Sequence, residues 1–340
     1  MQANGSLIEL GVIGGLAVIV VLANYAETRP FLRAPVHGIL AVIDFIFMIN
    51  FALPPAQSTL ARANSTAASI AALAFGIVAL LLLFGNVRRR IAPLFPRRQL
   101  DLQTGLQVGF DPDSTLHMTA LVLCVFLLAN TVLSFIVEGG LSGLAQNFTG
   151  ITGSELWTQL GIWLLFAALG VGLGLRRSLL STLRRLGLRA PTLSELFMGA
   201  GMAAFLFGIA FFVAIVWEGS TSKETFNQQT VFSEKIGNSV NTLLLGFLIA
   251  GTAAVGEEIA FRGALQPIFG LWPTAIFFGA IHTQYVLTPA SLLIVIVGLG
   301  LGWLRRKYNT TTSIVAHFLY DFVPLAIFLF GQLATQALTR

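Results

Sequence analysis

Apolar runs recur from one end of the chain to the other, and each approaches the roughly 20 residues that a helix needs to cross a bilayer. Lipid offers no hydrogen-bond partner to a free backbone amide or carbonyl, so open segments of this length must be helices. Charged residues make up 10% of the chain and hydrophobic residues 56%, whereas a soluble domain carries roughly 25% charged residues. The sequence therefore predicts an all-α, polytopic integral membrane protein.

The ends of these runs predict about ten transmembrane helices, with the polar groups held inside the helix bundle. The seventh helix is expected to continue past residue 257, because no strong helix breaker occurs before Pro267. Gly270 and Pro273 then mark the end of that helix and the start of the next. The expected spans are 7–25, 36–53, 66–85, 118–137, 157–175, 196–217, 240–269, 273–285, 289–304 and 312–331.

The basic residues gather in short clusters between the apolar runs, which is the pattern of cytoplasmic connections in membrane proteins. With the N-terminus outside, four of the five cytoplasmic connections are basic, which favours this orientation. The same clustering argues against nucleic acid as a partner, in spite of the net charge of +5. The basic segment 176–189 is expected to form a short helix along the membrane surface.

A polar stretch at 86–115, with a turn-like Asp-Pro-Asp sequence at 111–113, predicts a boundary between two parts. The first part, 1–115, is expected to be an N-terminal three-helix membrane region followed by a basic cytoplasmic loop. The second part, 116–340, is expected to hold the functional core. Cys124 is the one cysteine, so neither an intrachain disulfide nor a cysteine metal cluster is possible. The oligomeric state stays open.

The polar groups with chemical potential lie in the last expected helices. Glu257, Glu258 and Arg262 follow an almost wholly apolar run, and a carboxylate within a membrane is a functional candidate because its burial is costly. Glu258 and Arg262 are four residues apart and can pair on one helix face. That pairing directs Glu257, about 100° round the helix, elsewhere. Two further apolar helices carry His282 and His317 at depths similar to that of Glu257.

These residue types are sufficient for hydrolysis. A carboxylate with a histidine can activate water as a general base. A second histidine can donate to the oxyanion of a tetrahedral intermediate. Asp321 follows His317 by four residues and is placed to fix the tautomer and tilt of that imidazole.

Other interpretations of the same residues stay open at this point. Glu257, His282 and His317 form a plausible set of zinc ligands, although no HExxH sequence is present. The same acids and histidines would also suit a proton-coupled transporter or a non-catalytic scaffold. Glu258 and Arg262 would then form a purely structural ion pair.

The candidate residues fall in three motifs that occur in order on separate helices. Glu257-Glu258-Ile259-Ala260-Phe261-Arg262 has the form EExxxR, Phe278-Gly279-Ala280-Ile281-His282 the form FxxxH, and His317-Phe318-Leu319-Tyr320-Asp321 the form HxxxD. This set resembles the CPBP family of intramembrane proteases, also called the Abi or CAAX-protease-and-bacteriocin-processing family. The motifs cover 257–321, and the family core is expected to extend from about residue 180 to the C-terminus.

The resemblance implies a role for each residue. Glu257 and His282 would activate the attacking water, and His317 with Asp321 would form the oxyanion hole. The prenyl-protein enzymes of the family have Asn at the position of Asp321. An ionised Asp cannot donate to an oxyanion, so Asp321 must either be protonated or orient His317. This departure weakens the case for CAAX cleavage.

The resemblance also implies that Glu258 and Arg262 are supporting residues. It implies a glutamate-type intramembrane endopeptidase that needs no cofactor, with a zinc enzyme as the lesser alternative. The implied substrates are membrane-embedded or prenylated, CAAX-like peptides and proteins. Together with the charge pattern, it predicts a multi-pass protein of the plasma membrane whose active site opens toward the cytoplasm.

Overall fold

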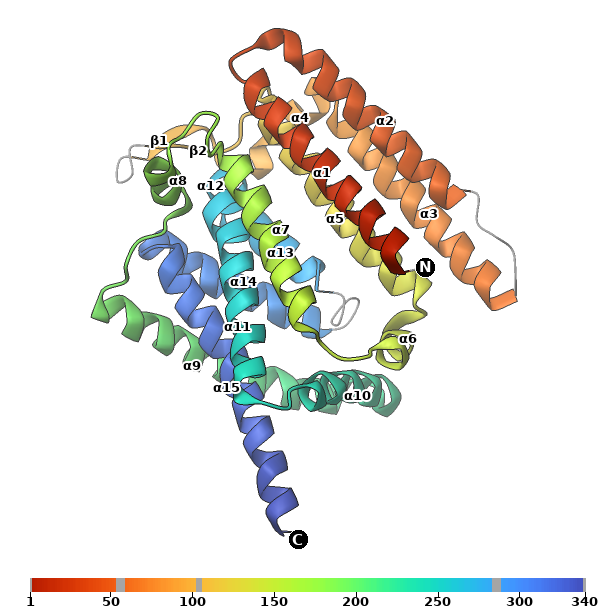
Figure 1. Cartoon of the computed structure of the whole chain (residues 1–340), viewed down its shortest axis with the longest axis vertical. Helices are drawn as coiled ribbons and strands as arrows, with labels where there is room; N and C mark the ends of the chain where they lie inside the picture. The colour runs from red at the N-terminus through yellow and green to blue at the C-terminus, as the bar shows by residue number, and fades with distance from the viewer. Residues whose placement is uncertain (1, 53–58, 102–105, 283–288, 339–340) are drawn as a thin grey trace.

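The computed structural model describes residues 2–52, 59–101, 106–282 and 289–338. Helices make up nearly all of these residues (Figure 1), and the prediction of an all-α, polytopic membrane protein is confirmed. The one sheet within the described ranges is an antiparallel hairpin of β1 (Gln99–Asp101) and β2 (Leu106–Val108).

Four long helices pack together in the first part of the chain (Figure 1). Helix α3 (Thr59–Leu82) contacts both α2 (Arg33–Ala52) and α5 (Thr115–Val137), and α1 (Gln2–Ala26) packs against α5. Their shared core is aliphatic. Although α5 follows the expected boundary, it packs on the helices that precede it. The division of the chain at residue 115 stays a prediction.

The polar connection between α3 and α5 is folded. It contains α4 (Gly85–Ile91), the single turn η2 (Ala92–Leu94) and the β1–β2 hairpin, and a second single turn, η1 (Pro30–Leu32), joins α1 to α2. Arg88 in α4 is buried and donates from Nη1 to the carbonyl oxygens of Leu82 and Leu83 at 2.7 and 2.8 Å. These bonds hold the sharp bend of 96° between α3 and the helix that follows it.

The second group of helices surrounds the candidate motifs. Helix α15 (Thr310–Leu338) contacts α9 (Leu193–Ser220), α11 (Leu243–Glu258) and α14 (Pro289–Lys307). Helix α7 (Gly153–Val171) lies between the two groups, because it contacts α1 on one side and α11 on the other (Figure 1).

The helix that carries the two glutamates continues past them, as the sequence predicts. Helix α11 passes into the π-helical segment η3 (Ile259–Leu265) and then into α12 (Gln266–Phe269). The chain breaks at Gly270, whose φ of 86° lies in the region that favours glycine. Helix α13 (Leu271–Ala280) starts there but ends earlier than expected. Residues 283–285 of the expected span lie outside the described residues.

Three shorter helices lie in the connections, namely α6 (Gly140–Asn147), α8 (Leu179–Leu186) and α10 (Lys223–Ser239). Helix α8 confirms the short helix expected within 176–189. Helix α10 forms in the polar stretch between two of the expected spans, 196–217 and 240–269. Polarity alone does not separate a loop from a polar helix that packs on its neighbours, as α10 does on α6.

The expected number of spans was too high. Six of the described helices are long and apolar enough to cross a membrane, or up to seven if the bent pair of α3 and α4 counts as one span. Helix α13 has 10 residues, about 15 Å of helix, and it packs against α14. Helix α14 ends in three basic residues. An apolar run is buried equally well by lipid or by protein, so a sequence pattern overcounts the helices that cross.

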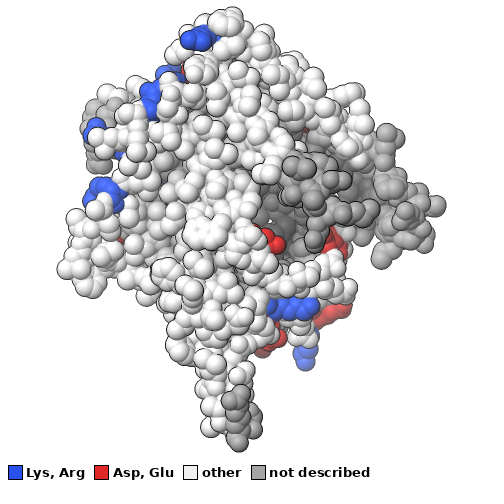
Figure 2. Space-filling model, viewed as in Figure 1, with Lys and Arg blue, Asp and Glu red and all other residues white. Residues whose placement is uncertain are grey.

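On the face shown in Figure 2, charged side chains gather along the upper and upper-left edge and in a second group at the lower right, and much of the surface between the two groups is uncharged. Lys and Arg dominate the upper end, where Figure 1 places α4, α8, α12 and the β hairpin. These elements belong to the connections that the charge pattern assigns to the cytoplasmic side. Large apolar side chains are exposed on the long apolar helices, such as Phe211 and Phe212 on α9, as contact with lipid requires.

Candidate active site

The Glu-Glu-x-x-x-Arg motif lies where the chain passes from an α-helix to a π-helix. Glu257 and Glu258 close α11, and Arg262 lies in the middle of η3. A π-helical turn within an α-helix is rare and occurs often at functional sites. The sequence predicted an unbroken helix here, but not its wider turn.

Two glycines allow this helix to lie close to its neighbours. A Cβ atom at Gly256 would lie 2.9 Å from the Trp163 side chain on α7. A Cβ atom at Gly263 would lie 3.0 Å from the carbonyl oxygen of Leu186, at the end of α8. Larger residues at either position would push η3 away from the helices that hold it.

Glu258 is the centre of the buried network. Its side chain is fully buried, and its Oε2 lies 3.2 Å from Nε of Arg262. Its other oxygen, Oε1, accepts a hydrogen bond of 2.9 Å from Nδ1 of His317. The pairing of Glu258 with Arg262 is the one that their four-residue spacing predicts. Glu258 thereby ties α11, η3 and α15 together and has no access to solvent.

Arg262 is also fully buried and has two further contacts. Its guanidinium carbon lies 4.2 Å from the ring centroid of Phe278, a cation–π contact. Its Nη2 donates to the carbonyl oxygen of Gly298 over 3.4 Å. The motif by itself does not predict this role of Phe278, since an apolar residue carries no signal for an arginine partner on another helix.

Glu257 and His282 face one another on the accessible side of the network. Oε2 of Glu257 lies 3.9 Å from Nε2 of His282, and the two side chains are 12% and 18% exposed. Nδ1 of His282 lies 2.6 Å from the carbonyl oxygen of Phe278, which can only accept. In the neutral imidazole Nε2 is then an acceptor that faces a carboxylate, so a shared proton or a water molecule is required between them.

His317 is held by carboxylates at both ring nitrogens. Nδ1 contacts Glu258, and Nε2 lies 3.2 Å from Oδ2 of Asp321 on the next turn of α15. The His317 side chain is 6% exposed, whereas that of Asp321 is 31% exposed. Asp321 is therefore the partner that another group can most readily displace.

The described residues contain no group of three or more His, Cys, Asp and Glu side chains arranged to hold a metal ion. Glu257, His282 and His317 do not form such a group, because both ring nitrogens of His317 face other carboxylates. The expectation that the protein needs no metal stays a prediction.

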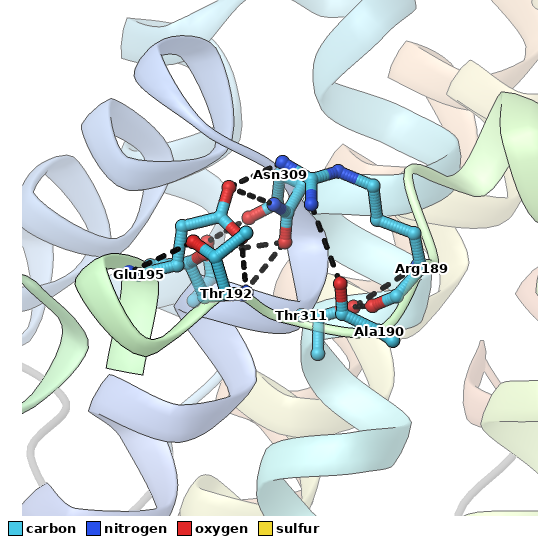
Figure 3. A network of polar contacts seen from close by, with 8 residues as sticks. Arg189, Ala190, Thr192, Glu195, Asn309 and Thr311 are labelled. Carbon is cyan, nitrogen blue, oxygen red and sulfur yellow. Dashed lines mark hydrogen bonds and ion pairs between the residues drawn. The ribbon is translucent and has the colours of Figure 1, made fainter. Parts of the chain in front are cut away.

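The helix that carries His317 is anchored at its start by a polar network between two loops (Figure 3). Asn309 precedes α15, and its side-chain amide donates to Oε1 of Glu195 over 2.8 Å. Its side-chain oxygen accepts from the backbone N–H of Thr312 at 2.9 Å, a helix cap. Glu195 also forms an ion pair with Arg189 and closes a capping box with Thr192 at the start of α9. The network fixes α15 against α9 and so helps to position His317.

Replacement of Asn309 by Ala is expected to lower the free energy of unfolding by about 1–3 kcal/mol. The substitution removes the cap of α15 and leaves a buried oxygen of Glu195 without its amide partner. Thermal unfolding in detergent measures the effect. Asn227→Ala, at an exposed position of α10, is the matched control. An unchanged unfolding midpoint for Asn309→Ala would show that the network does not anchor α15.

The structure brings all six candidate residues into one cluster. Phe278 touches the rings of both histidines, with centroid distances of 4.6 Å to His282 and 6.0 Å to His317. Sequence reasoning identified the charged and histidine members from their motifs. It did not predict that the Phe278 ring contacts both histidines or that Asn309 anchors α15. In the sequence, Asn309 shows only the local signal of a helix cap.

A bundle of membrane helices that encloses carboxylates and histidines defines a polytopic membrane protein with a site suited to hydrolysis. Residues 239–323, which contain every candidate residue, match the family described as Rce1-like, type II CAAX prenyl endopeptidase Rce1-like. The match confirms the resemblance to the CPBP family over these residues. At the level of the family, the activity is that of an intramembrane endopeptidase.

A relative in Bacillus subtilis (strain 168), the "Uncharacterized protein YpbD", is 28% identical over 111 residues. The alignment covers 31% of this chain and 51% of the relative, so the chain spans about half the length of that protein. No solved structure matches the chain.

Proposed function

We propose that the protein is a glutamate-type intramembrane endopeptidase that cleaves a membrane-embedded or prenylated, CAAX-like substrate. The observation that carries this proposal is the pair of Glu257 and His282. These two groups face each other at 3.9 Å and are partly exposed, beside a glutamate and an arginine that are fully buried. Of the two adjacent glutamates, Glu257 is the less buried, at 9% exposure against 0% for Glu258, and its Oε2 has no hydrogen-bond partner among the described residues.

The proposed reaction begins with a water molecule held between Glu257 and His282. The carbonyl oxygen of Phe278 keeps the proton of His282 on Nδ1, so Nε2 is free to accept from this water. Glu257 takes a proton from the water molecule, and the oxygen of that water attacks the scissile carbonyl carbon. The same proton then passes to the leaving amine, as is usual for general acid–base catalysis.

The proposed oxyanion site is made by His317 and Asp321. Nε2 of His317 contacts Asp321, which is partly exposed. The oxyanion would either displace the Asp321 carboxylate from Nε2 or accept a hydrogen bond from a protonated Asp321. Either arrangement satisfies the rule that an ionised carboxylate cannot donate. Glu258 and Arg262 act as positioning residues, because their contacts hold His317 and η3 but are closed to solvent.

The proposed location follows from the basic connections. We propose that the protein resides in the plasma membrane with its N-terminus outside. The substrate would enter from the cytoplasmic side, where the basic connections attract anionic lipid headgroups. No cofactor is part of the proposed mechanism.

The proposed function is tested by incubating the purified protein with membrane peptides and prenylated CAAX peptides, with and without a strong chelator. Cleavage that survives the chelator supports a glutamate protease. Loss of cleavage with recovery on addition of zinc would replace it by a metalloprotease. If no peptide of either kind is cleaved, the proposal is wrong and the same buried acids and histidines serve transport or a scaffold.

His317→Ala is expected to lower kcat by about 100- to 1,000-fold with a much smaller change in KM. An oxyanion donor stabilises the transition state and contributes little to substrate binding. Steady-state kinetics on the cleaved peptide measures the two constants, and thermal unfolding checks that the variant is folded. An effect confined to KM would assign His317 to substrate binding instead.

A further inference from the structure

A large cavity separates the N-terminal helices from the helices of the candidate active site. It measures about 990 Å³, at the upper end of the roughly 300–1,000 Å³ typical of ligand sites. Helices α1 and α5 form one wall, and α7 with η3 forms the other. None of the six candidate active-site residues lines it. The cavity is therefore separate from the proteolytic site.

The cavity follows α7 along most of the helix. Its lining on α7 extends from Ser154 to Val171, about 25 Å at 1.5 Å per residue. This is close to the thickness of the hydrocarbon core of a bilayer, about 30 Å. The lining residues from the middle of α1 and α7 are apolar and include Leu16, Ile162 and Phe166, whereas the lining near the start of α7 is polar, with Ser154, Glu155, Thr158 and Gln159. Its length and polarity fit a hydrocarbon chain better than a compact soluble molecule.

One end of the cavity is basic. Arg98, Arg176, Arg177 and Arg185 line it there. Arg98 is paired with Asp111, but the other three form no ion pair with a carboxylate within the described ranges. The nearby acid Glu27 accepts from the hydroxyl of Ser114 and the backbone N–H of Leu116 instead. Three guanidinium groups thus meet at one end of the cavity without an ion pair to a described carboxylate, and Arg176 and Arg177 donate instead to Asn24 Oδ1 and to the carbonyl oxygen of Val171.

Arg185 is the most deeply placed of these cations. It is 5% exposed, and its Nη1 donates to the carbonyl oxygen of Gly263 on η3 over 2.8 Å. Burial, together with Arg177, Arg305 and Arg176, lowers the pKa of Arg185 to about 9. A bound anion would relieve both the burial of this charge and the repulsion among the arginines.

We propose that the cavity binds one molecule of an anionic glycerophospholipid, with its phosphate on Arg176, Arg177 and Arg185 and an acyl chain along α7. Guanidinium groups match phosphate oxygens in charge and in geometry. Arg185 lies on α8, and Arg176 and Arg177 lie in the connection between α7 and α8. Figure 1 places α8 at the end of the molecule where the basic connections gather, and basic connections attract anionic lipid headgroups. This inference does not rest on the proposed proteolytic activity.

Native mass spectrometry of the purified protein, titrated with lipid in detergent, tests the proposal. Phosphatidylglycerol is expected to bind more tightly than phosphatidylcholine with the same acyl chains. The double variant Arg176→Gln/Arg177→Gln is expected to bind phosphatidylglycerol at least ~10-fold more weakly, because charge-assisted hydrogen bonds are lost. The matched control, Arg90→Gln/Arg184→Gln, changes two exposed arginines that do not line the cavity and is expected to bind as the wild type does.

A second pair of variants tests the apolar part while leaving the arginines in place. Gly170 lines the cavity, and Gly161 lies on the same helix but outside it. A Cβ atom at either position would meet nothing within 4 Å, so leucine fits at both without a clash at Cβ. Gly170→Leu is expected to fill the cavity and lose phosphatidylglycerol, whereas Gly161→Leu is expected to retain it.

Several outcomes would overturn the proposal. Equal binding of phosphatidylcholine and phosphatidylglycerol would show that the arginines do not recognise the headgroup. Tight binding of phosphatidylglycerol by Gly170→Leu would show that the lipid does not occupy the cavity. Binding of glycerol phosphate as tight as that of phosphatidylglycerol would mean that only a soluble anion is recognised. Displacement of the lipid by a prenylated peptide would make the cavity part of the substrate path. The Glu257→Gln protein is expected to bind the lipid normally, which separates this test from the test of proteolysis.

Discussion

Glu257→Gln is expected to lower peptide cleavage by about 100- to 10,000-fold while leaving the protein folded. The amide keeps the shape of the carboxylate but cannot take a proton from water. Oε2 of Glu257 lies 3.9 Å from Nε2 of His282. No other described carboxylate forms an ion pair with that histidine, since Glu258 contacts Arg262 and His317 instead. Steady-state cleavage of a prenylated or membrane peptide measures the loss.

The matched control for this variant is Glu218→Gln. Glu218 is exposed near the end of α9 and outside the cluster, so its replacement is expected to leave cleavage unchanged. Equal unfolding midpoints for both variants and the wild type would show that the loss is chemical. Full turnover by Glu257→Gln would exclude Glu257 as the general base.

Glu258→Gln is expected to have the opposite pattern, with its main effect on stability. Glu258 and Arg262 are both fully buried, and removal of one partner leaves the other charge in an apolar interior. Breaking such a pair costs about 3–5 kcal/mol. The remaining contacts of Arg262, with Phe278 and the carbonyl oxygen of Gly298, do not neutralise its charge. We expect a marked fall in the thermal unfolding midpoint, with loss of activity as a consequence.

The double variant Glu258→Gln/Arg262→Met tests whether the unpaired charge is the cause. Removing both charges avoids the buried cation, so the double variant is expected to be more stable than Glu258→Gln alone. A midpoint for Glu258→Gln equal to that of the wild type would mean that the ion pair contributes nothing to stability. A double variant less stable than the single one would show that the arginine stabilises the fold by packing.

The contrast between the two glutamates could not be read from their order in the chain. The four-residue spacing of Glu258 and Arg262 predicts the pair, and it directs Glu257 to another face. The full burial of Glu258 and the lesser burial of Glu257 depend on α15, which carries His317, and on the residues just after α13, which include His282. Those helices are far away in the sequence, and no local pattern states how deeply they pack.

The basic residues illustrate the same limit. Their clustering predicts which connections share one side of the membrane, and the corresponding elements do lie at one end of the molecule (Figure 1). It did not predict that Arg176, Arg177 and Arg185 would line one cavity. This depends on α1 and α5 lying opposite α7, a contact between segments that share no motif.

The sequence by itself determined the class of protein, the helical nature of its apolar runs and the six residues of the candidate site. An open apolar segment in a bilayer must be a helix, because lipid offers no partner to its backbone groups. Acids and histidines within a membrane are rare, because their burial is costly. Only the tertiary structure decided which apolar helices are long enough to cross, where the helix widens into η3, and which glutamate is the less buried. These features depend on packing between distant segments, where an apolar residue fits protein and lipid equally well.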